Sequence, residues 1–242
     1  MSKIVDRTLD FFELFAEQKR TLSLSEIAKL LDIPVSSCHD VLQALIRRGY
    51  VYELASRAGY YPTSRLYTLA EAIVDHDPLL LRAELAMDAL AAKVGETVAL
   101  AKASDLEMSY VMVKESNHQL RFSVRVGDGV RSLYATSAGK ALLGSLDGKA
   151  RDAVIARLKL EQFTPMTIVD RDALRNDIAV GVERGWYLND EESALDAMTL
   201  SASFRWRNVL YVLTVAGPKS RVSSKREEII DSLLETCRQL SA

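Results

Sequence analysis

The pattern of residues 23–51 constrains this chain more than any other feature. Ser23 precedes Glu26 by three positions, which is the capping-box spacing that starts a helix. Apolar residues then recur at helical spacing until Pro34, which disfavours an α conformation in the residue before it and opens a second helix. Gly49 supplies the left-handed stop of that second helix. The sequence therefore predicts two short helices joined by a tight turn.

Two runs of β-forming residues follow the second helix. Residues 50–54 and 60–63 flank the turn-forming residues 55–59, and this arrangement predicts a β-hairpin wing. An earlier helix, over residues 5–17, carries apolar side chains that pack behind the helix pair. Such a winged helix-turn-helix is too small for catalysis and is shaped to enter a DNA groove.

The outer face of the second helix is polar. If this helix enters the major groove, we expect its base-contacting residues to be Ser36, Ser37, His39 and Gln43. Two further residues, Arg47 and the wing residue Arg57, are expected to approach phosphates. The bulk charge gives weak support, because residues 1–65 hold nine basic and eight acidic residues. The alternative is that the arginines are only solvated surface groups.

The residues after the wing continue with helical periodicity. No Gly-rich or Pro-rich linker interrupts residues 66–77, so we predict a helical linker between two domains. Asp77 and Pro78 then suit the cap and first position of a further helix, which runs to residue 93. The predicted organisation is a DNA-binding domain at 1–65, a linker at 66–77 and a second domain at 78–242.

The second domain reads as an α+β fold with an antiparallel sheet, because short spacings separate its predicted strands. The strands are predicted at residues 97–102, 108–114, 120–126, 186–188, 200–205 and 209–216. The helices are predicted at residues 138–145, 148–158, 171–184 and 224–240.

Composition argues against several classes of protein. No apolar stretch is long enough to span a bilayer and no signal-like segment opens the chain, so we expect a cytoplasmic protein that does not bind membranes. Cys38 and Cys237 are the only cysteines, which argues against a disulfide framework and a cysteine metal site. The three histidines lie in separate predicted elements without a neighbouring nucleophile. We therefore expect no catalytic residue, metal or cofactor.

Residues 135–140 lead from an extended segment into a helix. The start of a helix presents free amides and the positive end of the helix dipole, which suit a carboxylate. The segment is not a P-loop, because Tyr134 and Ala141 stand where that motif needs glycine and Ser or Thr. The alternative is that Thr136 or Ser137 simply caps a structural helix.

Two sets of segments share the order found in one known family. They are residues 24–28, 33–34, 36–37 and 42–51 near the start, and residues 120–127, 135–143, 163–168, 184–186, 190–192 and 216–218 further on. With these segments the chain resembles the IclR family of bacterial transcriptional regulators over nearly its whole length. The resemblance implies a GAF-like effector-binding fold for the second domain, and a homodimer or a dimer of dimers.

The resemblance also implies an effector cavity. In the family, the segment that contains Ser137, Ala138 and Gly139 lines this cavity, and the opposite wall comes from residues 189–193 and the strands after them. We expect the cavity to take a small organic acid, with aromatic acids among the options. The expected polar contacts are Asn189, Thr199 and Thr214, and the expected apolar walls are Leu120, Phe122 and Leu133.

The chain departs from the family at several positions. Val35 and Asp40 stand where the family often has lysine and arginine, and Asn189 stands where an acidic residue is common. An aspartate that faces DNA repels phosphate, although it can accept a hydrogen bond from cytosine N4. Asp40 therefore either marks an unusual operator or turns away to pair with an arginine. Glu191 and Glu192 are either solvated carboxylates or ion-pair partners.

These observations lead to one functional expectation and two rivals. We expect a ligand-responsive transcriptional regulator that binds operator DNA, controls metabolic genes and is not an enzyme. One rival is a small-molecule-binding or catalytic GAF-like protein with a degenerate DNA-binding module. The other is a dimerisation module that binds no ligand.

Overall fold

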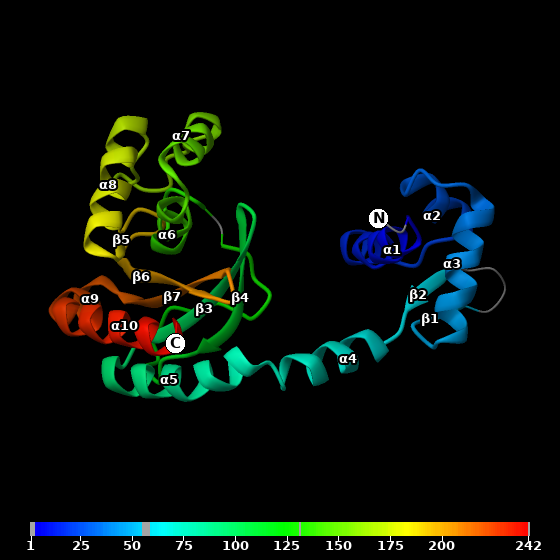
Figure 1. The fold of residues 1–242 in the computed structure, drawn as a ribbon, viewed down its shortest axis with the longest axis horizontal. Helices are drawn as coiled ribbons and strands as arrows, with labels where there is room; N and C mark the ends of the chain where they lie inside the picture. Colours follow the sequence, from blue (N-terminus) through cyan, green and yellow to red (C-terminus); the bar gives the residue numbers. More distant parts are fainter. Residues whose placement is uncertain (1–2, 55–58, 131, 242) are drawn as a thin grey trace. The chain divides into compact units, whose positions relative to one another are not determined.

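The computed structural model describes residues 3–54, 59–130 and 132–241 of the 242-residue chain. It divides into two compact units, Met1–Asp77 and Pro78–Ala242, which are best described separately (Figure 1). In none of the three described ranges is a helix both long and apolar enough to cross a lipid bilayer.

The first unit is a winged helix-turn-helix, as the sequence predicts. Its apolar core is formed by Phe11 and Phe15 from the first helix, Ile27 from the second, and Leu42 and Leu45 from the third. The elements are α1 (Lys3–Gln18), α2 (Leu24–Leu30), α3 (Val35–Arg47), β1 (Val51–Glu53), β2 (Tyr60–Pro62) and α4 (Arg65–Val74).

Local signals fix the ends of α2 and α3. The Glu26 amide donates to Ser23 Oγ at 3.3 Å, and the Ser23 amide donates to the Glu26 carboxylate at 2.9 Å, so the predicted capping box is confirmed. Pro34 occupies the N-cap of α3. Gly49 follows α3 with a φ of +74°, which confirms the predicted left-handed stop.

The wing is a short antiparallel hairpin, and a backbone bridge joins it to the helices. β1 pairs with β2 from Val51 opposite Pro62 to Glu53 opposite Tyr60. The Tyr60 amide donates to the Leu22 carbonyl at 2.8 Å, which ties the wing to the segment before α2. The turn at residues 55–58, which includes the candidate phosphate contact Arg57, lies outside the described residues.

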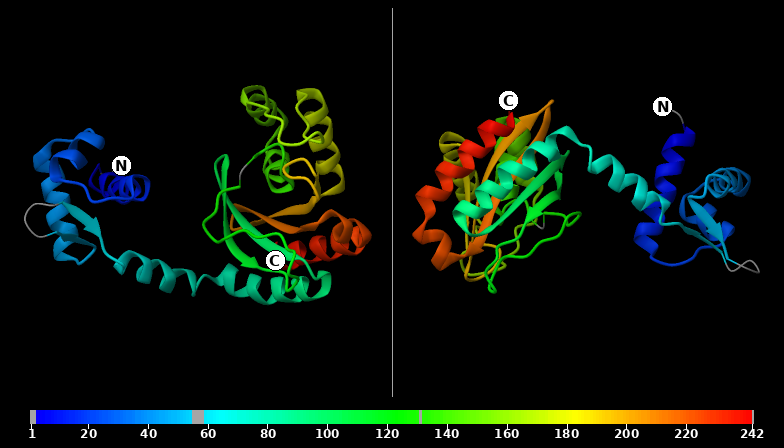
Figure 2. Two further views of the ribbon diagram at one scale, coloured as in Figure 1. Left: turned by 180° about the vertical axis from the view of Figure 1, so that it is seen from behind. Right: turned by 90° about the horizontal axis from the view of Figure 1, so that it is seen from below.

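The second unit is a five-stranded antiparallel sheet with helices on both faces, which confirms the α+β prediction. The strand order is β4-β3-β7-β6-β5. Helices α6, α7 and α8 lie on one face, and α5, α9 and α10 lie on the other (Figures 1 and 2). The strands are β3 (Thr97–Ser104), β4 (Glu107–Lys114), β5 (Tyr187–Asp190), β6 (Ala197–Trp206) and β7 (Val209–Pro218). The helices are α5 (Pro78–Val94), α6 (Ser137–Ser145), α7 (Gly148–Arg157), α8 (Arg171–Arg184), α9 (Lys219–Ser224) and α10 (Arg226–Ser241).

Each face of the sheet has its own apolar core. On the α5 and α10 side, Met87 and Leu233 pack with sheet residues such as Leu213. On the α6 and α8 side, Leu142 and Ile178 pack with the opposite face of the same strands. Because α6 is buried between the sheet and α8, its first turn is held in a fixed position within the unit.

Two predicted strands of this unit are wrong, one in kind and one in its bounds. Residues 120–126 do not form a strand: the Phe122 carbonyl accepts from the Thr97 hydroxyl at 2.7 Å, and the edge of β4 instead bonds with the backbone of residues 127–130. The helix predicted over 224–240 is confirmed as α10, and a short helix that was not predicted, α9, precedes it. The strand predicted at 186–188 is displaced to Tyr187–Asp190.

The capping box generates a stability prediction. Replacing Ser23 with alanine should lower the local free energy of unfolding of α2 by about 1 kcal/mol, because it removes the side chain that accepts the Glu26 amide. Amide hydrogen exchange of α2 at neutral pH measures this loss. Thr21→Ala is the control, since Thr21 is exposed beside the cap.

The same box predicts a pH dependence. Hydrogen bonds from the backbone and side chain of Ser23, and from Arg20, lower the pKa of Glu26 from 4.5 to about 2. A lowered folded-state pKa stabilises the fold above the unfolded-state value, and this stabilisation disappears as the pH falls towards 2. The difference in exchange between wild type and Ser23→Ala should therefore shrink between about pH 4.5 and pH 2. A constant difference would contradict the capping-box account.

Candidate DNA-reading surface and effector cleft

Helix α3 has one buried face and one polar face. It buries Cys38, Leu42 and Leu45 against the rest of the unit. Five of the six candidate DNA contacts lie on this helix, of which Ser36, His39 and Arg47 are exposed and Ser37 and Gln43 are half-buried. The sixth candidate, Arg57, falls in the undescribed turn of the wing.

The first turn of α3 is open to an anion. Its N-cap, Pro34, makes no side-chain hydrogen bond to the turn, and the turn contains no acidic residue. The amides at a helix start lack intrahelical partners and carry partial positive charge, which suits a phosphate. At the other end of the helix, Arg47 and Arg48 are exposed, whereas the Arg65 guanidinium lies over the Tyr50 ring at 5.3 Å. Basic groups and free amides thus occur at opposite ends of the same helix.

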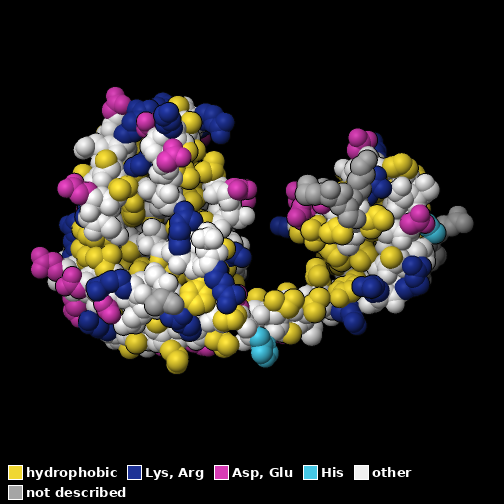
Figure 3. Space-filling view, in the orientation of Figure 1, with side chains coloured by type: hydrophobic (Ala, Val, Ile, Leu, Met, Phe, Trp, Pro, Cys, Tyr) yellow, Lys and Arg dark blue, Asp and Glu magenta, His cyan; other side chains and the backbone are white. Residues whose placement is uncertain are grey.

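Helix α4 buries none of its own residues within its unit. Its apolar residues Leu66, Leu69 and Ile73 recur at helical spacing, and Ile73 is 64% exposed. Figure 3 shows apolar side chains gathered over this helix. Leu66 and Leu69 also border a groove of about 720 Å³ between α1, α3 and α4, together with the polar residues Ser37 and Asp40 of α3.

In the second unit, the start of α6 is the centre of the candidate effector site. Thr136 is the N-cap, and its hydroxyl accepts the Gly139 amide at 3.0 Å. The amides of Ser137 and Ala138, the first two residues of the helix, have no intrahelical acceptor. Thr136 lines a cleft, whereas Ser137 and Ala138 are themselves buried.

A chain of buried hydroxyl groups joins α6 to the sheet. Ser137 Oγ lies 2.6 Å from Thr199 Oγ1 and 2.7 Å from Ser201 Oγ, and Ser201 Oγ lies 2.7 Å from Thr214 Oγ1. The structure therefore brings together the predicted residues Ser137, Thr199 and Thr214. It adds Ser201, which the sequence reasoning missed. The signal for Ser201 was its position two residues after Thr199 on β6, since alternate residues of a strand share a face.

Asn189 uses its side chain to shape a loop. Its Oδ1 accepts the Glu192 amide at 2.8 Å and its Nδ2 donates to Ser193 Oγ at 2.8 Å. Because these bonds occupy both ends of the amide group, Asn189 fixes residues 190–193 in a turn. Ser193 and its neighbour Ala194 line the cleft, so Asn189 acts on the cleft through them.

The cleft has a volume of about 480 Å³ and aromatic walls. It is lined by Tyr110, Phe122, Ser123, Val124, Asp128, Gly129, Ser132, Thr136, Phe163, Ser193 and Ala194. Of the predicted apolar walls, Phe122 lines it. Leu133 packs into the apolar cluster below α6, and Leu120 is 72% exposed. Gly139 is a packing residue, because a Cβ there would lie 2.2 Å from the Ser132 carbonyl oxygen.

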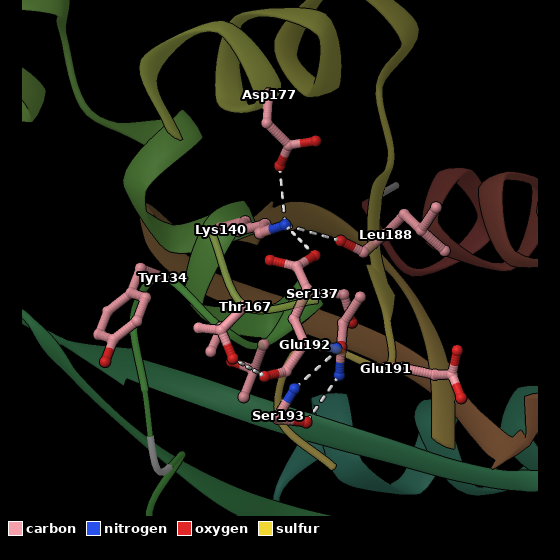
Figure 4. Close-up of polar contacts among 12 residues, drawn as sticks. Tyr134, Ser137, Lys140, Thr167, Asp177, Leu188, Glu191, Glu192 and Ser193 are labelled. Atoms are coloured by element: carbon pink, nitrogen blue, oxygen red, sulfur yellow. Dashed lines mark hydrogen bonds and ion pairs between the residues drawn. The ribbon is translucent and has the colours of Figure 1, made fainter. Parts of the chain in front are cut away.

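A buried lysine holds the elements around the cleft together. Lys140 on α6 is fully buried, and its Nζ lies 2.8 Å from the Asp177 carboxylate on α8 and 2.5 Å from that of Glu192 (Figure 4). The same Nζ donates to the Leu188 carbonyl on β5 at 3.1 Å. Burial raises the pKa of Glu192, and the nearby ammonium of Lys140 opposes this rise. The sequence reasoning missed this cluster.

Two threonines make further hydrogen bonds to the 190–193 turn. Thr164 donates to the Glu191 carbonyl and Thr167 to the Glu192 carbonyl, each at 2.6 Å. The Glu191 carboxylate pairs with Lys219 at 2.5 Å, so Glu191 and Glu192 are both ion-pair partners. Hydrogen bonds to its carbonyl groups and ion pairs to its carboxylates thus hold the turn in place.

The histidines do not form a cluster. His39 lies on α3, His76 follows α4, and His118 lies in the loop after β4. Throughout the described ranges, no group of three or more His, Cys, Asp or Glu side chains is placed to hold a metal ion.

Comparison with known proteins covers nearly the whole chain. Residues 4–55 match the model of the IclR helix-turn-helix domain, and residues 71–242 match that of the bacterial transcriptional regulator IclR C-terminal domain. The chain is 27% identical over 224 residues to the transcriptional repressor IclR of Escherichia coli K12, which spans 91% of this chain and 81% of that protein. It is 28% identical over 243 residues to the HTH-type transcriptional regulator BhcR of Paracoccus denitrificans, which spans 99% of this chain and 86% of the relative.

A solved structure shares the fold. The crystal structure of an IclR homologue from Microbacterium hydrocarbonoxydans, complexed with 4-hydroxybenzoate, matches with a TM-score of 0.74 at 20% identity and covers 99% of this chain and 98% of its own. The family match and the order of the elements confirm the resemblance inferred from the motifs. This chain belongs to the IclR family of bacterial transcriptional regulators.

Proposed function

We propose that this protein is a ligand-responsive transcriptional regulator that reads an operator with α3 and binds a small organic acid in the cleft beside α6. The observation that carries the ligand proposal is the position of Thr136, which both caps α6 and lines an aromatic cleft. We place the protein in the cytoplasm, where it controls metabolic genes, and assign it no catalytic step.

The DNA proposal follows from the two ends of α3. Polar residues that can reach base edges lie along its exposed face, and Arg47 lies beyond them at the C-terminal end. In this arrangement Gln43 contacts a base, whereas Arg47 neutralises a phosphate. Loss of the phosphate contact should lower affinity for every sequence, because a phosphate contact carries no sequence information. Loss of the base contact should instead lower sequence selectivity.

Replacing Arg47 with alanine should therefore weaken binding to every duplex and reduce the slope of log affinity against log salt by about one unit. Replacing Gln43 with alanine should relax selectivity at one or two base pairs at a cost of roughly 1–3 kcal/mol. Gel-shift titrations at several salt concentrations measure both effects. Arg175→Ala is the matched control, because it removes an arginine from α8 in the other unit. Equal losses in all three variants would contradict the placement of α3.

The ligand proposal follows from the chemistry of the cleft. Phe122, Phe163 and Tyr110 offer aromatic faces, and Ser193 offers a hydroxyl group. A carboxylate at the start of α6 would lie at the positive end of the helix dipole. The cleft also contains Asp128, whose carboxylate accepts the Arg125 amide at 2.9 Å. We therefore place the acid group at the α6 end and the ring or chain towards the aromatic walls. The 4-hydroxybenzoate complex of the Microbacterium homologue makes aromatic acids the first compounds to test.

Placing tryptophan at Ala194 should fill the cleft and abolish acid binding, while operator binding by the unliganded protein stays unchanged. Ala194 suits this test because it is exposed and lines the cleft, whereas Ala138 is buried in the core. Calorimetry with 4-hydroxybenzoate and a panel of aliphatic acids measures the effect. Leu195→Trp is the control, since Leu195 is exposed next to the cleft-lining residue. Binding of an acid to Ala194→Trp with wild-type affinity would refute the cleft assignment.

We further propose a homodimer or a dimer of dimers. A single winged helix reads only one half-site of an operator. The apolar residues of α4 are exposed in its own unit, and their burial against a second protein surface would be favourable. A second copy of the same unit supplies the matching stripe in a self-complementary interface.

Replacing Leu69 with glutamate should shift the protein towards monomer and weaken operator binding together with assembly. Thr68→Glu adds the same charge one residue away, about 100° around α4 from Leu69 and outside the stripe of Leu66, Leu69 and Ile73, and should leave the association unchanged. Sedimentation velocity at several concentrations measures both variants. The proposal fails if Leu69→Glu sediments as wild type does.

A further inference from the structure

Asp40 is the one acidic residue of α3. Its side chain is 86% exposed, and among the residues that the structure describes its ion-pair contact is with His39, whose Nδ1 lies 3.9 Å from Asp40 Oδ1. Asp40 therefore does not turn away to pair with a described arginine. Of the two alternatives that the sequence left open, the structure favours an aspartate that faces outward.

The helical geometry places Asp40 among the candidate base contacts. With 3.6 residues per turn, Asp40 lies within one turn of Ser36, Ser37 and Gln43. It lies roughly 200° around the helix from both Cys38 and Leu42, which are buried. If α3 enters the major groove on its polar face, the carboxylate of Asp40 enters with it.

A carboxylate in the major groove can do few things. It accepts hydrogen bonds and donates none, so guanine and thymine, which present acceptor oxygens there, repel it. Adenine presents a donor at N6 but an acceptor at N7 beside it. Cytosine presents its N4 donor without a neighbouring acceptor on the same base, so the carboxylate is best satisfied by cytosine.

We infer that Asp40 is a specificity-determining residue that reads a cytosine N4 in each operator half-site. This inference rests on the proposed reading of DNA by α3. Asp40 contributes to selectivity partly by disfavouring other sequences, because its negative charge near the phosphates weakens binding to every sequence that does not supply the N4 donor. Asp40 thus lowers affinity for non-operator DNA and raises selectivity.

The test selects bound sequences from a pool of random duplexes with the full-length protein. The wild type should enrich a cytosine at one position of each half-site, with about a tenfold preference over the other bases. Asp40→Asn should change that preference to adenine, because asparagine pairs with adenine N6 and N7. Asp40→Ala should enrich no particular base there. Both variants should bind random DNA about fivefold more tightly at low salt, because one charge is lost near the backbone.

Asp10→Asn is the matched control, because it removes the same charge from an exposed position on α1 and should leave the selected sequences unchanged. Circular dichroism checks that each variant is folded. If the wild type enriches a site and Asp40→Asn enriches the same bases, the inference is wrong while DNA reading by α3 stands. If Asp40→Asn changes self-association but not the selected bases, Asp40 belongs to a contact with a second copy, which also overturns the inference. If the folded wild type enriches no sequence, the proposed DNA reading fails and the inference fails with it.

Discussion

One buried ammonium group links the elements that border the cleft of the second unit. Lys140 is fully removed from water, and removing a charge from water costs several kcal/mol unless partners replace the lost hydration. Its partners come from three elements: Asp177 on α8, Glu192 in the turn after β5, and the Leu188 carbonyl. Loss of one partner of such a pair typically costs about 3–5 kcal/mol. Lys140 therefore ties α6 and the turn that lines the cleft to α8 and β5, in addition to the bonds that Asn189, Thr164 and Thr167 make to the same turn.

The cleft is the proposed ligand site, and the N-cap of α6 and the 190–193 turn both border it. Thr136 and Ser193 are brought to the same cleft although they come from distant parts of the chain. An acid bound there can alter DNA binding only if it binds two states of the protein unequally. Coupling of this kind usually changes affinity between 5-fold and 150-fold. The predicted linker at 66–77 is helical only as far as Val74, where α4 ends, and residues 75–77 separate it from α5.

The sequence predicts well where structure is decided locally, and poorly where distant residues decide it. Ser23, Pro34 and Gly49 act on their own neighbours, so the ends of α2 and α3 could be read from them. The alternation at 120–126 fits a strand, but alternation does not reveal that the edge of β4 is already occupied by residues 127–130. The burial of Lys140 depends on carboxylates from α8 and the turn after β5, and no local pattern indicates them. Thr199 and Ser201 lie two residues apart on β6, so the sequence alone could place their hydroxyl groups on one face of that strand. Only the family resemblance pointed to Ser137 on α6, which both hydroxyl groups contact.

The measurement that tests this account most directly is the effect of a bound acid on DNA affinity. A labelled duplex enriched from the random pool is titrated with full-length protein, followed by fluorescence anisotropy, with and without an acid that calorimetry shows to bind. We predict that the apparent Kd for the duplex changes at least about fivefold when the acid is saturating, and that Ala194→Trp abolishes the change while keeping the unliganded affinity. An acid that occupies the cleft at saturation and leaves the Kd for the duplex unchanged would contradict the account.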